Sequence, residues 1–79
     1  MRRDKRVKEA VLSPTQREAK EERKYRNGLL TDSDWTQLAD APITKAKIKE
    51  WATYRQALRD ITKQPGFPFT VVYPTEPSA

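Results

Sequence analysis

The chain has few large apolar side chains for its length, and this shortage limits what it can fold into by itself. Valine, isoleucine, leucine and the aromatic residues together provide 19 such side chains among 79 residues. One small domain is therefore the largest unit that the chain can form. Because a domain of this size rarely buries enough apolar area to be strongly stable alone, we expect a partner surface to cover some of the aromatic side chains.

Cysteine and histidine are both absent from the sequence. Their absence excludes disulfide bonds, thiolate or imidazole metal sites, and nucleophiles activated by histidine. Asp32, Asp34 and Asp40 lack the central glycine and terminal glutamate of a calcium loop. Two aspartates in a turn are more typical of backbone capping than of acid–base catalysis. We therefore predict no catalytic residue, no metal, no cofactor and no small-molecule substrate.

The positive charge is concentrated near the N-terminus. Residues 1–26 contain ten Lys and Arg against five Asp and Glu, whereas residues 27–79 contain six of each kind. The most basic stretch is an arm formed by Arg2, Arg3, Lys5, Arg6 and Lys8. A solvated arm and an arm docked on an acidic protein are both compatible with this pattern. Nucleic-acid binding is the lesser alternative, because no aromatic residue lies within the cluster to stack on bases.

The hydropathy pattern gives no sign of a membrane segment. No apolar run is long enough to span a bilayer, and the basic N-terminus is not followed by the apolar core of a signal peptide. We expect no membrane partner and a location in the cytoplasm where the chain is made.

Residues 14–27 are predicted to form a first helix. Serine at Ser13 is a favoured N-cap, and proline at Pro14 is tolerated because the first helical amide has no partner. We expect no capping box, on the ground that Arg17 stands where a glutamate would be needed. Asn27-Gly28 suits a left-handed residue that stops a helix. A short basic helix is also predicted upstream, over residues 2–12.

A second helix is predicted over residues 45–62, with Thr44 as its N-cap and Pro65-Gly66 after its end. Ile43 and Ile48 occupy the two positions of a hydrophobic staple. At 100° per residue, one arc of about 140° collects the apolar side chains and also contains Arg55. The apolar members of this arc are Ile48, Trp51, Tyr54, Leu58 and Ile61.

The C-terminal residues form a tail that contains four of the six prolines. Proline favours extended backbone, so we expect a polyproline-like tail with one short strand over residues 69–73. Phe67, Phe69 and Tyr73 either fold back on the Trp51 face or add to the edge of a partner. The expected fold is mostly α, a small helical hairpin-like domain with a basic N-terminal helix and an extended Pro-rich tail.

Two further interpretations stay open for the aromatic and charged residues. Trp35 and Trp51 either anchor a partner interface or stack on each other as the core of the domain. Arg55 either pairs with Asp34 or Asp40, stacks on an indole, or lies solvated at the rim. The predicted partner-binding residues are Trp35, Trp51, Tyr54, Arg55, Leu58, Ile61, Phe67, Phe69 and Tyr73.

Three signatures occur in order along residues 23–77: an Asp-Trp-Thr step at Asp34, a Trp-x-x-Tyr-Arg helix from Trp51, and a Pro-Gly-Phe-Pro exit from Pro65. With them stand Arg26-Asn27-Gly28-Leu29-Leu30, Asp40-Ala41-Pro42-Ile43 and Tyr73-Pro74. In this combination the chain resembles the phage tail assembly chaperone family, the C-terminal module of phage tail-fibre assembly proteins. The expected organisation is a basic helical arm at 1–22 and a chaperone-like module at 23–77.

The resemblance implies a non-enzymatic chaperone or adaptor that shields apolar surface of a phage tail or tail-fibre protein. Its expected place is the cytoplasm of the host bacterium during assembly. The alternative is a minor structural protein that stays in the virion tail. A basic nucleic-acid-binding module is the lesser alternative, and a homo-oligomer is a further option.

Overall fold

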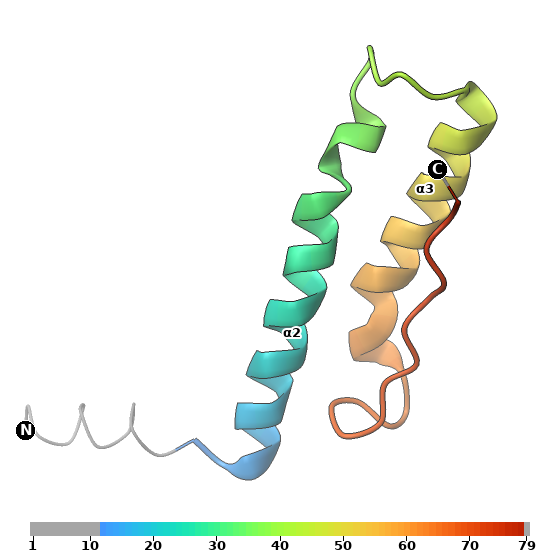
Figure 1. The fold of residues 1–79 in the computed structure, drawn as a ribbon. Coiled ribbons are helices and arrows are strands. Elements are labelled where there is room, and N and C mark those ends of the chain that lie inside the picture. Colours follow the sequence, from blue (N-terminus) through green and yellow to red (C-terminus); the bar gives the residue numbers. More distant parts are fainter. Residues whose placement is uncertain (1–11, 79) are drawn as a thin grey trace, which may run out of the picture.

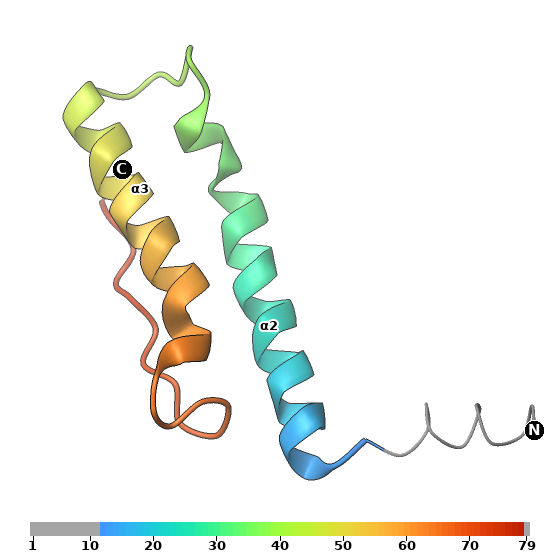
Figure 2. The ribbon, with the colours of Figure 1, turned by 180° about the vertical axis from the view of Figure 1, so that it is seen from behind.

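Two helices arranged as an antiparallel hairpin make up most of the fold. The computed structural model describes residues 12–78. Helix α2 spans Pro14–Asp32 and helix α3 spans Lys45–Arg59, and each is followed by a short 3-10 helix, η1 (Asp34–Gln37) and η2 (Asp60–Lys63). Figures 1 and 2 show α2 and α3 side by side, with the C-terminal segment running back along them. The predicted mostly helical hairpin is confirmed. The upstream helix predicted over residues 2–12 lies outside the described residues apart from Leu12, and so does the cluster Arg2, Arg3, Lys5, Arg6 and Lys8, whereas residues 14–22 of the predicted arm form the start of α2.

Helix α2 begins at the predicted place but with a more complete cap than expected. The Ser13 hydroxyl accepts the amide of Gln16 at 3.1 Å, and the Ser13 amide donates to Oε1 of Gln16 at 2.9 Å. This reciprocal pair is a capping box. The expectation of no capping box was wrong because the third helical residue is Gln16 and not Arg17, and glutamine serves there as well as glutamate.

The predicted end of this helix at Asn27-Gly28 was also wrong. Helix α2 continues to Asp32, and no glycine among residues 12–78 has a positive φ. The extra turn brings Leu29 and Leu30 against the core, and their burial offsets the cost of about 1 kcal/mol for a glycine inside a helix. Ser33 ends the helix, because its amide and its hydroxyl both donate to the carbonyls of Leu29 and Leu30.

Helix α3 agrees closely with the prediction. The Thr44 hydroxyl accepts the amide of Lys47 at 3.1 Å, which confirms the N-cap. The α-helix ends at Arg59, and η2 carries the helical path on to Lys63. The buried residues of α3 are Trp51, Tyr54, Arg55 and Leu58, all from the predicted arc.

The core lies between the two helices and is small. Trp51, Tyr54 and Leu58 form its buried cluster, and Ile61 of η2 is fully buried as well. Partly buried side chains close the cluster from the other elements, namely Leu29, Leu30, Ile43 and Tyr73. The hairpin is therefore held together by contributions from both helices, the connection and the tail.

The connection between the helices begins with a short helix, and the C-terminal tail differs from expectation in local structure. Residues 34–37 form η1, and the predicted strand at 69–73 is absent, because residues 12–78 contain no strand. In place of a neighbouring strand, the side chain of Gln64 bonds both backbone groups of Val72, at 2.9 Å to its amide and 2.8 Å to its carbonyl. The tail thus folds back on the hairpin, which is one of the two arrangements left open by the sequence.

Candidate partner-binding surface

Arg55 joins the two helices through three hydrogen bonds. Its Nη1 donates to the carbonyl of Leu30 at 2.6 Å and to Oγ of Ser33 at 2.7 Å, and its Nη2 donates to Oδ1 of Asp34 at 2.7 Å. Of the alternatives left open for Arg55, the structure has the ion pair with Asp34, and no ion pair with Asp40 forms among the described residues. The guanidinium also adds a charged donor to the last turn of α2, where the Leu30 carbonyl accepts bonds from Ser33 as well.

Two polar residues that sequence reasoning passed over complete this junction. Ser33 and Thr36 are both buried, and the Thr36 hydroxyl donates to the carbonyl of Ser33 at 2.6 Å. Together with Arg55 they form a buried polar hub between α2, η1 and α3. Short polar residues in a turn give no signal of burial by themselves, and only the apolar arc around Arg55 hinted that a polar partner would be needed.

The hub holds Trp35 in a fixed place at the end of the hairpin. Trp35 belongs to η1, directly between Asp34 and Thr36, and its ring lies 6.3 Å from that of Trp51 at an interplanar angle of 53°. Trp51 is buried, but Trp35 keeps 41% of its surface exposed. One indole therefore belongs to the core, and the other rests on it with a face open to solvent.

The remaining predicted partner-binding residues divide by exposure. Phe69 is exposed, Phe67 and Tyr73 are half-buried, and the predicted residues that belong to the arc are buried in the hairpin. Contact of a partner with the buried set stays a prediction. The buried set consists of Trp51, Tyr54, Arg55, Leu58 and Ile61.

Three exposed apolar side chains were not among the predicted partner-binding residues. Leu38 follows η1 with 56% of its surface exposed, and Val72 of the tail is 72% exposed. Tyr25 on α2 is 59% exposed although its ring meets that of Tyr73 edge to face, with the ring centroids 5.2 Å apart. Helical periodicity selects residues that share one face, so it cannot identify apolar side chains in short turns and tails.

Tyr73 fastens the tail to α2. Its hydroxyl donates to Oε1 of Glu22 at 2.6 Å, and its ring packs against the core cluster. Burial is the main cause that raises the pKa of Tyr73 above its ordinary value, and the Glu22 carboxylate raises it further through the hydrogen bond and its charge. Lys47 of α3 reaches Ser78 at 3.2 Å, so the tail is attached to both helices.

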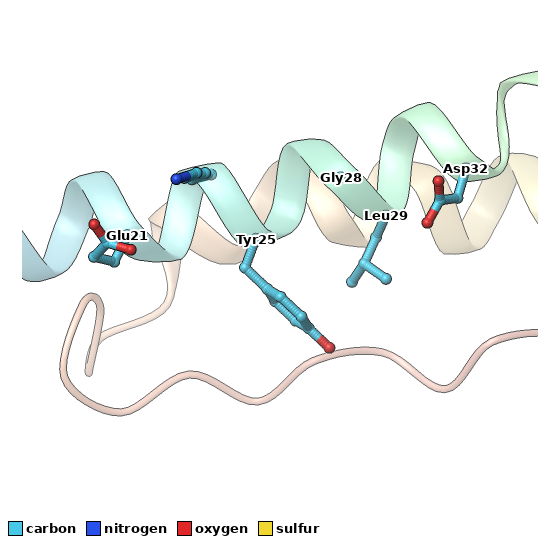
Figure 3. A pocket seen from close by; sticks show the side chains of 6 residues that line it. Glu21, Tyr25, Gly28, Leu29 and Asp32 are labelled. Atoms are coloured by element: carbon cyan, nitrogen blue, oxygen red, sulfur yellow. The ribbon is translucent and has the colours of Figure 1, made fainter.

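A shallow groove lies along one face of α2 (Figure 3). Its volume is about 450 Å³, and Tyr25 and Leu29 point toward the tail side of it, while Gly28 leaves the helix surface bare. All of its lining comes from one helix: Glu21, Lys24, Tyr25, Gly28, Leu29 and Asp32. A second hollow, more basic, adjoins it and is lined by Lys20, Arg23, Lys24 and Asn27.

Residues 12–78 hold no group of three or more acidic, cysteine or histidine residues that could bind a metal ion. Within the same residues no helix combines the length and the apolar character needed to cross a bilayer.

Comparison with protein families identifies a relationship for most of the chain. Residues 19–78 match the family described as phage tail assembly chaperone protein. The matched range begins inside α2 and takes in η1, α3, η2 and the tail, so it contains both the polar hub and the exposed indole. No curated protein and no solved structure matched the chain.

Proposed function

Because the chain belongs to the phage tail assembly chaperone family, we propose that it binds and shields an apolar surface of a phage tail or tail-fibre protein before that protein assembles. The observation that supports this most directly is the exposed pair Trp35 and Leu38, here called the Trp35 surface. In a chain so poor in large apolar residues, leaving an indole and a leucine in water is costly unless another molecule covers them.

The setting of Trp35 is suited to an anchor. Its neighbours in η1 are fixed by the polar hub, and its ring rests on Trp51, so little conformational entropy is lost when a partner covers it. Rigid aromatic side chains that are half-exposed before binding are typical energetic centres of interfaces. We propose that Trp35 fills a pocket on the tail protein and that Leu38 extends the same contact.

Phe69 and Val72 provide a second exposed apolar group, on the tail and its preceding turn. The tail is held by side chains and not by a sheet, since Gln64 and Tyr73 carry its hydrogen bonds. We propose that this group contributes a secondary contact with the same tail protein. Its role is separable from that of the Trp35 surface because the two groups lie on different elements.

The test is co-expression of the chain with the tail or tail-fibre protein of the same phage. Wild-type chain should raise the soluble yield of that protein, and the double variant Trp35→Ala, Leu38→Ser should lose most of this effect. Trp35→Phe serves as the matched control, since it keeps an aromatic ring on Trp51. Circular dichroism of the purified variants shows that each is folded. A folded double variant that protects the tail protein as well as wild type does would overturn the proposal.

Timing is part of the same proposal. A shielding protein must leave when the tail protein docks, so we propose that the chain acts in the host cytoplasm and is absent from finished particles. Mass spectrometry of purified virions tests this, and a stoichiometric amount of the chain in the tail would favour the structural alternative.

A further inference from the structure

Gly28 occupies a position in α2 for which the hairpin itself gives no reason. Its φ is that of an ordinary helical residue, and a Cβ placed on it would meet nothing within 4 Å. Neither backbone conformation nor internal packing therefore requires glycine here. A glycine inside a helix costs stability relative to alanine. What it provides is a bare stretch of backbone that another molecule can approach closely.

Asp32 is the second residue of α2 that is unfavourable for the isolated hairpin. It is the last residue of the helix, where the macrodipole favours a cation, and the last turn contains no basic residue. Among residues 12–78, neither Asp32 nor Lys24 takes part in an ion pair. Both side chains line the groove that surrounds Gly28. The groove therefore presents Lys24 and Asp32, a cation and an anion without an ion-pair partner in this part of the chain, beside a second carboxylate at Glu21.

The spacing of these residues gives the face a self-complementary pattern. When two helices pair in antiparallel fashion with their crossing point at one residue, the positions equally far before and after it face each other. Lys24 and Asp32 lie four residues before and four residues after Gly28. An antiparallel pair of α2 helices that crosses at Gly28 therefore places Lys24 of each copy opposite Asp32 of the other copy. Two such pairs form by symmetry.

We propose that the α2 face lined by Lys24, Tyr25, Gly28 and Asp32 binds the same face of a second copy of this chain, antiparallel and centred on Gly28. The two glycines let the helix backbones approach closely at the crossing point. Tyr25 then covers Thr31 of the second copy, and its ring loses the solvent exposure seen in the single chain. This inference does not depend on the proposed function and uses none of the residues of the Trp35 surface.

A second copy is favoured over an unrelated protein because the complement of this face is the face itself. One helix on each side buries less area than a standard interface, so the dimer is weak and forms at high local concentration. Sedimentation and NMR titration of the full chain should follow it from about 10 μM to about 1 mM, the range in which small interfaces associate.

Charge exchange provides the decisive experiment. The single variants Lys24→Glu and Asp32→Lys each place like charges opposite each other at two sites, and each should weaken self-association by about tenfold or more. An equimolar mixture of the two single variants restores both opposite-charge pairs in the heterodimer. Labelling one variant and titrating it with the other should therefore recover wild-type affinity. The doubly exchanged variant should also self-associate like wild type.

The variant Gly28→Leu provides an independent test of the same proposal. A Cβ at this position meets nothing within 4 Å in the single chain, and leucine is a better helix former than glycine, so the melting temperature at low concentration should not fall, while association should be lost. A wild-type chain that stays monomeric over the whole range would overturn the proposal. So would single variants that associate normally, or a mixture that fails to recover the affinity. None of these results bears on solubilisation of the tail protein, which tests the proposed function separately.

Discussion

Replacement of Arg55 by methionine should cost more stability than any change to its charged partner. Methionine keeps the aliphatic volume of the buried stem but removes three hydrogen bonds. Bonds to a charged group contribute about 1.5–3 kcal/mol each when they are shielded from water. Two of the three, those to Leu30 and Ser33, lie in the half-buried or buried hub, whereas Asp34 is 63% exposed.

The difference in burial among these three hydrogen bonds determines how much stability each variant loses. Solvent screening limits the ion pair with Asp34 to about 1 kcal/mol or less. The two shielded bonds contribute more, but methionine also avoids the cost of burying the guanidinium. The Leu30 carbonyl keeps hydrogen bonds from Ser33, so no acceptor is left unpaired there. We therefore expect Arg55→Met to lower the free energy of unfolding by about 2–3 kcal/mol, and Asp34→Asn by about 0.5 kcal/mol.

Urea unfolding followed by circular dichroism measures both values, and thermal melting gives a second measure. A loss of this size in Arg55→Met lowers the melting temperature by about 10–20 °C for a domain of this length. Arg55→Lys is the matched control, because it keeps the charge but cannot reach three acceptors, and it should fall between wild type and Arg55→Met. Equal losses in Asp34→Asn and Arg55→Met would refute the reasoning, since they would show that the exposed ion pair and not the buried hub joins the helices.

Three more outcomes follow from the glycines and the tail. Gly28→Ala should raise the free energy of unfolding by about 1 kcal/mol in dilute thermal melts, because alanine finds free space and is the better helix former; a loss would contradict the open environment of this residue. Gly66→Ala should destabilise the chain in the same melts, because its Cβ would lie 2.8 Å from Cβ and the carbonyl of Thr70; unchanged stability would show that this turn adapts. Because the pKa of Tyr73 is raised in the folded chain, its hydroxyl contributes fully to the free energy of unfolding below the ordinary pKa of 10.0. This contribution is lost as the pH rises above that value, because Tyr73 of the unfolded chain ionises first. Tyr73→Phe should cost about 1 kcal/mol at neutral pH and reduce the alkaline loss, part of which remains through Tyr54, whose pKa is also raised by burial; an unchanged pH profile in urea unfolding would contradict this.

Features that depend on neighbouring residues in sequence could be predicted well. Ser13 and Thr44 cap their helices because a hydroxyl before the first turn bonds amides that are always unpaired there. Of the apolar arc, Trp51, Tyr54, Leu58 and Ile61 are buried as the periodicity predicts, and Ile48 is half-buried. The ion pair of Arg55 with Asp34 was among the alternatives that the sequence left open, because a charge inside an apolar arc requires a partner.

Features that depend on tertiary contacts could not be predicted from the sequence. Asn27-Gly28 is a good local stop signal, but the packing of Leu29 and Leu30 on the core outweighs it. The alternation of aromatic residues in the tail favours a strand, yet no second strand exists among residues 12–78 to pair with it. Gln64 takes that role with its side chain, and no rule of local sequence identifies such a bond in advance.

The same limit applies to the candidate site. The resemblance indicated a protein-binding role, and Trp35 was a clear candidate anchor. Which aromatic residues stay exposed was not predictable, because exposure is decided by how η1 and the tail settle on the hairpin. Leu38 and Val72 are exposed for that reason, although nothing in their local sequence sets them apart from core residues.

The unequal settings of the two indoles give this protein a built-in optical probe. An aqueous quencher reaches Trp35 in the free chain but not Trp51. Binding at the Trp35 surface should protect the accessible fraction of the emission and shift it to the blue, while unfolding should make both rings accessible. Engagement of a tail protein and loss of structure thus change the fluorescence in opposite directions, so one unlabelled sample can distinguish them.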